Sequence, residues 1–337
     1  MSPWISVHIF YGREQRVLLL ECIAPMLAEL EKAGVVDRYF FVRYWEGGPH
    51  VRLRVIPSPG FEEQVKQAVE CRLQEFLASR PVFFAVPQVA EQWWRRSFIL
   101  EYGEAELHRK YGPEGIIPRY PENTFHYIPY EPEYARYGGP EGMEISERHF
   151  HVSSRMALER LTWDNMHAGG VRIAQTVQIM LGLCFAFLET QEAVARFTME
   201  YATSWYRRFF DGKASVLNAQ VLPMADLAVG RVSRRIRRAA QDFQAGTFHA
   251  ITRQDAEWFD HGRRLRSEMR TLIQNGRVRV SDMPRRADAS DDSLASLIAL
   301  LFSYVHMTNN RLGASLSEEV GMAYLVSRSL QPQAQGI

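Results

Sequence analysis

The chain has 337 residues, of which 46% are hydrophobic and 23% are charged, a balance typical of a folded globular protein. Its 40 basic and 39 acidic residues give a net charge of +1, which excludes a molecule whose whole surface is built to coat nucleic acid or an anionic membrane. Cys22, Cys71 and Cys184 are odd in number and widely spaced, so neither a disulfide framework nor a zinc site is predicted.

The first hundred residues alternate between strand and helix patterns. Hydrophobic periodicity predicts, in order, a strand at 4–11, a helix at 15–33, strands at 38–45 and 50–56, a helix at 61–77 and a short strand at 82–86. This order, β-α-β-β-α-β, is that of a ferredoxin-like unit. The chain begins without a basic segment and its apolar run near residue 180 is short, which predicts a cytoplasmic protein with no membrane partner.

Residues 50–55 alternate polar and apolar side chains. Because side chains point to opposite faces along a strand, His50, Arg52 and Arg54 are expected to share one face. Two guanidinium groups about 7 Å apart suit a carboxylate, a phosphate or a developing oxyanion. A solvated polar face also explains the pattern without any ligand. The connection Glu46-Gly47-Gly48-Pro49 predicts a hairpin that holds this row in place.

Residues 93–140 are crowded with Trp, Tyr, Pro and Gly, which predicts an ordered, wrapping loop. Near its end, Glu133, Arg136 and Tyr137 place a carboxylate, a guanidinium and a phenol within five positions, before a double glycine. The simpler alternative is a turn in which Glu133 and Arg136 merely pair with each other.

From Gly142 to about residue 328 the pattern is helical. The predicted fold is therefore α+β, with a ferredoxin-like part at 1–100, an aromatic and proline-rich loop at 101–141 and a helical part at 142–330, packed as one compact body and one functional domain.

Two helical segments carry further polar side chains. In the segment 304–311, His306 and Asn310 are four residues apart, hence on one helical face, and Arg311 follows. A histidine at a helix end is often only structural or stabilised by the helix dipole. A basic run, at Arg231, Arg234, Arg235, Arg237 and Arg238, is typical of a solvated face and is the less common sign of a docking surface.

Several short motifs, in the right order, resemble those of one protein family. They are Phe40-Phe41-Val42-Arg43-Tyr44, Pro49-His50-Val51-Arg52-Leu53-Arg54, Glu133-x-x-Arg136-Tyr137-Gly138-Gly139-Pro140, Ser146-Glu147 and His306-Met307-x-x-Asn310-Arg311. From about residue 4 to residue 328, the chain resembles the C-terminal domain of class I lantibiotic dehydratases, which also occurs as standalone thiopeptide-type bacteriocin biosynthesis proteins.

The resemblance implies one of two activities. In one branch the domain eliminates glutamate from glutamylated Ser or Thr of a precursor peptide to give dehydroalanine or dehydrobutyrine. In the other, a thiopeptide pyridine synthase joins two dehydroalanines in a formal [4+2] cycloaddition with loss of water and the leader peptide. We favour elimination, since the chain retains an arginine cluster suited to dicarboxylates and a histidine suited to proton transfer.

The residue roles that the resemblance implies fall into two sets. The catalytic set is Arg52, Arg54, Glu133, Arg136 and His306, and the substrate-binding set is Arg43, His50, Tyr137, Asn310 and Arg311. No cofactor or metal is expected. The implied partners are a precursor peptide, with leader and core, and a separate tRNA-dependent glutamylating dehydratase subunit; no direct nucleic-acid contact is expected, and a homodimer is left open. A third hypothesis is a non-catalytic subunit that docks the precursor peptide.

Overall fold

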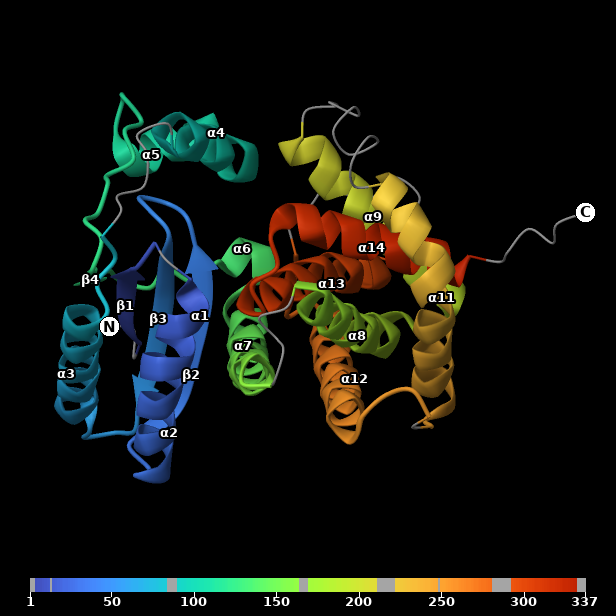
Figure 1. Ribbon diagram of the computed structural model, residues 1–337, viewed down its shortest axis with the longest axis horizontal. Coiled ribbons are helices and arrows are strands. Elements are labelled where there is room, and N and C mark those ends of the chain that lie inside the picture. The colour runs from blue at the N-terminus through green and yellow to red at the C-terminus, as the bar shows by residue number, and fades with distance from the viewer. Residues whose placement is uncertain are drawn as a thin grey trace, which may run out of the picture. The chain divides into compact units, whose positions relative to one another are not determined.

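The computed structural model describes residues 4–12, 14–83, 90–163, 169–210, 222–247, 249–280 and 292–331. The chain divides into two compact units, Met1–Glu131 with Phe150–Trp163 and Pro132–His149 with Asp164–Ile337. A four-stranded antiparallel sheet lies in the first unit, and helices make up the second (Figure 1). The α+β class is confirmed, whereas the predicted boundaries at 1–100, 101–141 and 142–330 stay predictions.

The sheet of the first unit has the strand order β2-β3-β1-β4. Its strands are β1 (Ile5–Phe10), β2 (Val36–Tyr44), β3 (His50–Pro57) and β4 (Thr124–Tyr127). The first three correspond to the strands predicted at 4–11, 38–45 and 50–56. β3 is central, with β1 on one side and β2 on the other, each antiparallel to it.

The predicted hairpin between β2 and β3 is present and depends on Gly47. This residue has φ +77°, and a Cβ there would lie 2.6 Å from the carbonyl oxygen of Pro118. Any side chain would therefore meet both an unfavourable backbone conformation and a steric clash. The Gly47 carbonyl also accepts a hydrogen bond from the Tyr120 amide, which ties the hairpin to the aromatic loop.

The fourth strand differs from the one predicted at 82–86. Residues 82 and 83 are not in a strand, residues 84–86 lie outside the described residues, and β4 is formed about 40 residues later in the chain. The Asn123 side chain accepts a hydrogen bond from the Val82 amide at 2.7 Å and donates to the Val82 carbonyl at 2.9 Å. A side-chain amide thus satisfies the backbone groups that a strand partner would otherwise need to satisfy.

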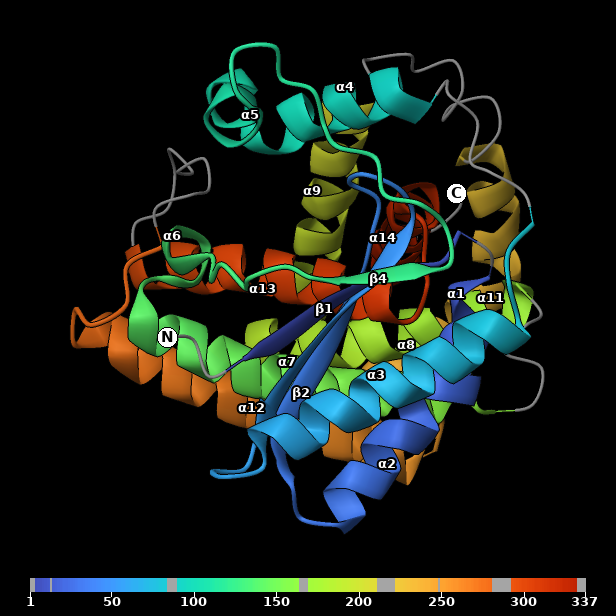
Figure 2. The same cartoon turned by 90° about the vertical axis from the view of Figure 1, so that its left-hand side faces the viewer.

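Helices cover one face of this sheet. They are α1 (Gln15–Leu18), η1 (Leu19–Ile23), α2 (Ala24–Lys32) and α3 (Glu62–Ser79). Figure 2 shows α2 and α3 side by side over the strands. The predicted helix at 15–33 is continuous but contains a single π-helical turn, η1. Val51, Leu53 and Val55 of β3 are fully buried and form the core of this layer.

The aromatic loop contains two helices of its own, α4 (Ala90–Tyr102) and α5 (Glu104–Tyr111). Trp94, Phe98, Leu107 and Ile117 form a small separate core there. The segment predicted as a wrapping loop is thus partly helical, and its predicted order stays a prediction.

Helix α7 (Pro140–Leu161) supplies residues to both units. Its second half bonds to the edge of the sheet, because the Phe41 amide donates to the Ser154 hydroxyl and the Tyr39 amide donates to the His151 ring. These contacts satisfy two amides of β2, the terminal strand of the sheet, and protect that edge from pairing with another strand.

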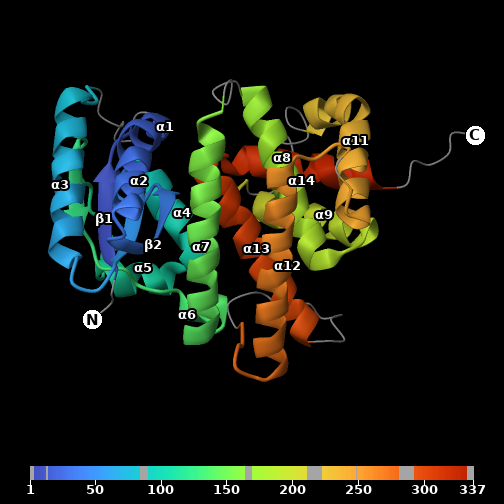
Figure 3. The same cartoon turned by 90° about the horizontal axis from the view of Figure 1, so that it is seen from below.

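The second unit is built around one apolar helix. Its helices are α6 (Tyr134–Tyr137), the first part of α7, α8 (Gly169–Leu188), α9 (Gln191–Phe209), α11 (Leu222–Ala245), α12 (Arg253–Gln274), α13 (Asp292–Arg311) and α14 (Leu316–Leu330). Helix α8 packs against α9, α11, α12, α13 and α14, and Figure 3 shows it beside α12 and α14.

Candidate functional site

The candidate residues are divided between the two units, so each cluster is described by itself. In the first unit, His50, Arg52 and Arg54 project from one face of β3, and Val51, Leu53 and Val55 project from the helix-covered face. The predicted alternation is confirmed. Opposite this row, His8 of β1 pairs with Arg52 and Ser6 pairs with Arg54.

Arg52 already has a carboxylate partner. Its Nη2 lies 3.3 Å from Glu46 of the hairpin, and the Lys110 ammonium lies 2.6 Å from the other oxygen of the same carboxylate. Its guanidinium also lies 3.5 Å above the centre of the Tyr44 ring. Two cations therefore share one anion, and this cluster keeps a net positive charge that favours a further anion.

His50 is a buried, neutral partner of Arg52. Its Nδ1 donates to the Gly48 carbonyl at 2.8 Å, and its Nε2 accepts from the Nε of Arg52 at 3.1 Å. Burial and the Arg52 charge lower the pKa of His50 to about 3, and burial also lowers the pKa of His8, which stacks on it. His50 is therefore a fixed hydrogen-bonding group at neutral pH.

Arg54 lies against aromatic rings. Its guanidinium is 4.3 Å from the Tyr130 ring centre and 5.1 Å from that of Phe40, a cation–π arrangement that fixes its position. Arg43 is not part of this row. It pairs with Val51 in the β2–β3 register and thus lies on the opposite face of the sheet from Arg52.

In the second unit, Glu133 at the N-cap of the short helix α6 and Arg136 in its last turn form an ion pair of 2.9 Å. The two side chains are 47% and 24% exposed, so the pair contributes little to stability by itself. This contact is the one that the simpler alternative predicted, and a role in catalysis stays a prediction for both residues.

His306 lies in a polar contact that the sequence did not indicate. Its Nδ1 is 3.1 Å and 3.2 Å from the two carboxylate oxygens of Glu319 in α14. Glu319 is 1% exposed, and it also accepts hydrogen bonds from the Tyr201 hydroxyl and from the Asn309 amide. The His306 side chain remains 26% exposed and packs on the Trp205 ring.

The three substrate-binding candidates of this unit differ in exposure. Tyr137 is 2% exposed, its hydroxyl is 2.7 Å from that of Ser303, and burial raises its pKa to about 12. Arg311 is fully buried and its Nη1 donates to the Met307 carbonyl. Asn310 is half-buried. Tyr137 and Arg311 are thus packed in the interior of the unit, and their predicted contact with substrate stays a prediction.

The basic run lies on α11. Arg234, Arg235 and Arg238 are exposed, as a solvated face requires, while Arg237 donates to the Ser329 carbonyl. The side chain of Arg231 lies outside the described residues. Within the described ranges, no group of three or more His, Cys, Asp or Glu side chains is arranged to hold a metal ion.

Sequence reasoning missed Glu319, although one signal was present. Glu319 occupies the same helical face as Met322, Ala323 and Val326, at spacings of three, four and seven residues. Burying a lone carboxylate in an apolar stripe costs free energy unless the carboxylate is hydrogen-bonded. The pattern therefore indicated that Glu319 has a hydrogen-bonding partner. The sequence could not identify that partner as His306.

Comparison with protein families gives one match across nearly the whole chain. A sequence model of the family described as "Lantibiotic biosynthesis dehydratase C-term" matches residues 4–330. No protein among those with curated functions matches the chain.

Three solved structures share the fold. A pyridine synthase, TbtD, from thiomuracin biosynthesis superposes with a TM-score of 0.73 at 17% identity, covering 97% of both chains. TsrL gives 0.67 at 17% identity, covering 97% of this chain and 93% of TsrL. The tRNA-dependent lantibiotic dehydratase MibB from Microbispora sp. 107891 gives 0.55 at 17% identity, covering 97% of this chain but only 28% of MibB.

Proposed function

Because the chain belongs to the lantibiotic biosynthesis dehydratase C-terminal family, we propose that it acts on a ribosomally made peptide and eliminates glutamate from its glutamylated Ser or Thr residues. The products are glutamate and a dehydroalanine or dehydrobutyrine residue. The observation that carries this proposal is the contact between His306 and the buried carboxylate of Glu319, with part of the His306 ring exposed.

The chemistry needs a base at the α-carbon. His306 takes the α-proton, the electrons of the Cα–H bond form the Cα=Cβ double bond, and the Cβ–O bond breaks so that glutamate leaves as a carboxylate. A histidine suits this step because its pKa is ordinarily close to the working pH.

The arginines supply positive charge for two anions, the enolate-like oxygen that forms during proton removal and the departing carboxylate. Arg54 and Arg136 are each partly exposed and held by a neighbour, Tyr130 in one case and Glu133 in the other. Arg52 carries the excess charge of its cluster with Lys110, so a substrate carboxylate either joins Glu46 there or displaces it.

A second candidate is a pyridine synthase, favoured by one observation. The pyridine synthase TbtD and this chain cover 97% of each other's length, whereas the chain corresponds to only 28% of MibB. That reaction needs tautomerisation of an amide and loss of water and a peptide amide, and it makes less use of a cluster of arginines.

The reaction requires a peptide substrate and a second protein. The substrate is a precursor peptide with a leader and a core, and a separate tRNA-dependent subunit attaches the glutamate. The net charge of +1 gives no reason to expect direct binding of nucleic acid by this chain.

Mass spectrometry distinguishes the two reactions. The protein is incubated with a peptide that carries a glutamyl ester on Ser, and in parallel with a thiazole peptide that carries two dehydroalanines. Release of glutamate with formation of dehydroalanine supports elimination. Loss of water and of the leader amide from the second peptide supports the pyridine synthase, and no change in either peptide leaves the docking hypothesis.

Two substitutions test the assigned roles. We expect His306→Ala to lower the rate of glutamate release by about 10²–10⁴-fold and Arg54→Ala to lower it by about 10²-fold, so that the glutamylated peptide accumulates. The matched controls are His249→Ala and Arg253→Ala, since both residues are exposed in the second unit. Unchanged turnover in the His306 and Arg54 variants contradicts the assignment.

A further inference from the structure

We propose that Glu319 is a positioning residue that holds the His306 ring with its Nδ1 protonated and raises its affinity for a proton, so that Nε2 accepts the α-proton. This inference rests on the proposed function for its chemical meaning. The contact between His306 and Glu319, on which it depends, is independent of that function.

The donors around Glu319 suit a carboxylate that accepts hydrogen bonds, which is the form that the proposal assigns to it. The Tyr201 hydroxyl and the Asn309 amide both donate to it, and the His306 Nδ1 lies within hydrogen-bonding distance of both oxygens. An ionised carboxylate is an acceptor only, and its two oxygens offer about four lone-pair positions. Burial and the Glu319 charge raise the pKa of Tyr201 well above its ordinary value, so that phenol remains a donor.

The ionised carboxylate determines which His306 nitrogen carries the proton. Because Glu319 can only accept, the Nδ1 of His306 must be the protonated nitrogen in the neutral ring. Proton exchange with a substrate then falls to Nε2. A neutral imidazole with the opposite tautomer would point a lone pair at the carboxylate, which is repulsive.

The same charge raises the proton affinity of the ring. Glu319 from α14 and Tyr201 from α9 are titratable groups of this contact, and Trp205 and Asn309, which also touch the pair, are neutral. A carboxylate within about 4 Å favours the protonated imidazole by about one unit of pKa or more. The charge of Glu319 therefore contributes to the strength of His306 as a base.

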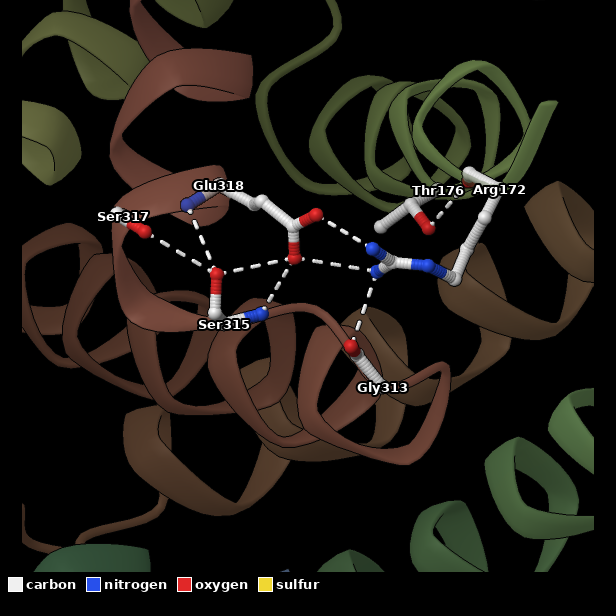
Figure 4. Close-up of polar contacts among 6 residues, drawn as sticks. All are labelled: Arg172, Thr176, Gly313, Ser315, Ser317 and Glu318. Carbon is white, nitrogen blue, oxygen red and sulfur yellow. Dashed lines mark hydrogen bonds and ion pairs between the residues drawn. The ribbon is translucent and has the colours of Figure 1, made fainter. Parts of the chain in front are cut away.

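The start of α14 is anchored, which fixes the position of Glu319. Ser315 and Glu318 form a capping box, in which each side chain bonds to the backbone amide of the other. Figure 4 shows the side chain of Arg172, from α8, in contact with Glu318 and Gly313. Its Nη1 donates to the Gly313 carbonyl at 2.9 Å, and its guanidinium forms an ion pair with the Glu318 carboxylate. Glu318, the residue next to Glu319, is thus tied to α8 and to the N-cap of its own helix.

The test uses NMR of the full chain labelled with ¹⁵N-histidine, in which the His306 signal is assigned from its loss in a His306→Gln variant. We expect the neutral ring to show the Nδ1-protonated tautomer. We further expect Glu319→Gln, which keeps the size of the side chain but removes its charge, to lower the pKa of His306 by about one unit or more. The Nε2-protonated tautomer in the parent, or an unchanged pKa in the variant, overturns the proposal.

Two further variants complete the test. Glu257→Gln is the matched control, because Glu257 is an exposed carboxylate on α12, and it is expected to leave the His306 signal unchanged. Circular dichroism establishes whether Glu319→Gln folds. If Glu319→Gln does not fold, Tyr201→Phe is used instead. Because this variant removes one hydrogen-bond donor from Glu319, more negative charge faces His306, and the pKa of His306 should rise. An unchanged pKa of His306 overturns the proposal.

The rate of glutamate release is measured in a separate experiment. In the parent, the rate of glutamate release should rise with pH as His306 loses its proton, and in Glu319→Gln this rise should move to lower pH by the same shift that NMR measures. A parent that releases no glutamate contradicts the proposed function, whereas the tautomer and the pKa of His306 still decide the role of Glu319.

Discussion

His50, which contacts Arg52 on β3, shows how one residue affects stability. Its ring is 1% exposed, and its low pKa means that the folded protein keeps it neutral, while the unfolded chain protonates it near pH 6.5. Between pH 6.5 and about 3 the unfolded state therefore binds more protons, and the stability of the fold falls as the pH falls.

We expect the substitution His50→Gln to remove part of this pH dependence. In the parent, His50 alone contributes a slope approaching about 1.4 kcal/mol per pH unit in that window. The variant loses hydrogen bonds and is less stable at pH 7, but its free energy of unfolding should fall less between pH 7 and pH 4.5. Urea unfolding at both pH values measures this difference, and equal losses in the two proteins would show that His50 is protonated in the fold.

The sequence predicted which face of the strand a residue occupies better than it predicted the residues that it contacts. The alternation in β3 predicted that Arg52 and Arg54 share a face, because strand geometry is local. It could not show that Arg52 and Lys110 share the Glu46 carboxylate, since Lys110 is 64 residues away from Glu46. Arg43 is a similar case: its motif gave no indication that it faces away from the row.

Helices and strands with a strong hydrophobic periodicity could be predicted from the sequence, whereas β4 could not. β4 has four residues in a stretch rich in proline and aromatic residues, and Asn123, with φ +59°, precedes it. A left-handed residue next to a short strand gives no periodic signal. The strand is defined by its pairing with β1, which is a tertiary contact.

The anchor of α14 makes a prediction about element stability. Arg172→Met removes an ion pair with Glu318, whose two side chains are only 20% and 26% exposed, and a hydrogen bond to the Gly313 carbonyl, so it should destabilise the protein by about 1–2 kcal/mol. The control, Arg253→Met, removes an ion pair whose partners are 92% and 63% exposed and should cost less than about 0.5 kcal/mol. Thermal unfolding compares the two, and equal shifts would show that the Arg172 contact is not a structural anchor.

For the molecule as a whole, the segment Gly170–Leu188 raises the question of a membrane. It is long and apolar enough to cross a bilayer, but 67% of its apolar window is buried against other helices. Gly262 of α12 allows close packing there, since a Cβ at this position would lie 2.7 Å from the Ala186 Cβ. This packing is that of a core helix.

We therefore expect the protein to remain in the supernatant after ultracentrifugation of a lysate made without detergent. The measurement is the fraction of the protein in the supernatant and in the pellet. Recovery only from the pellet, and only with detergent, would show that the segment lies in a membrane.

The contact between Lys110 and Glu46 also offers a spectroscopic reporter. Lys32, Lys66, Lys110 and Lys213 are the four lysines of the sequence. Reductive methylation with ¹³C-formaldehyde keeps their charge and gives few NMR signals, and the one from Lys110 reports on the carboxylate that also binds Arg52. If an incoming peptide carboxylate displaces Glu46 from Arg52, the methyl signal of Lys110 will shift, and the occupancy of the arginine cluster can be followed without any chemical turnover.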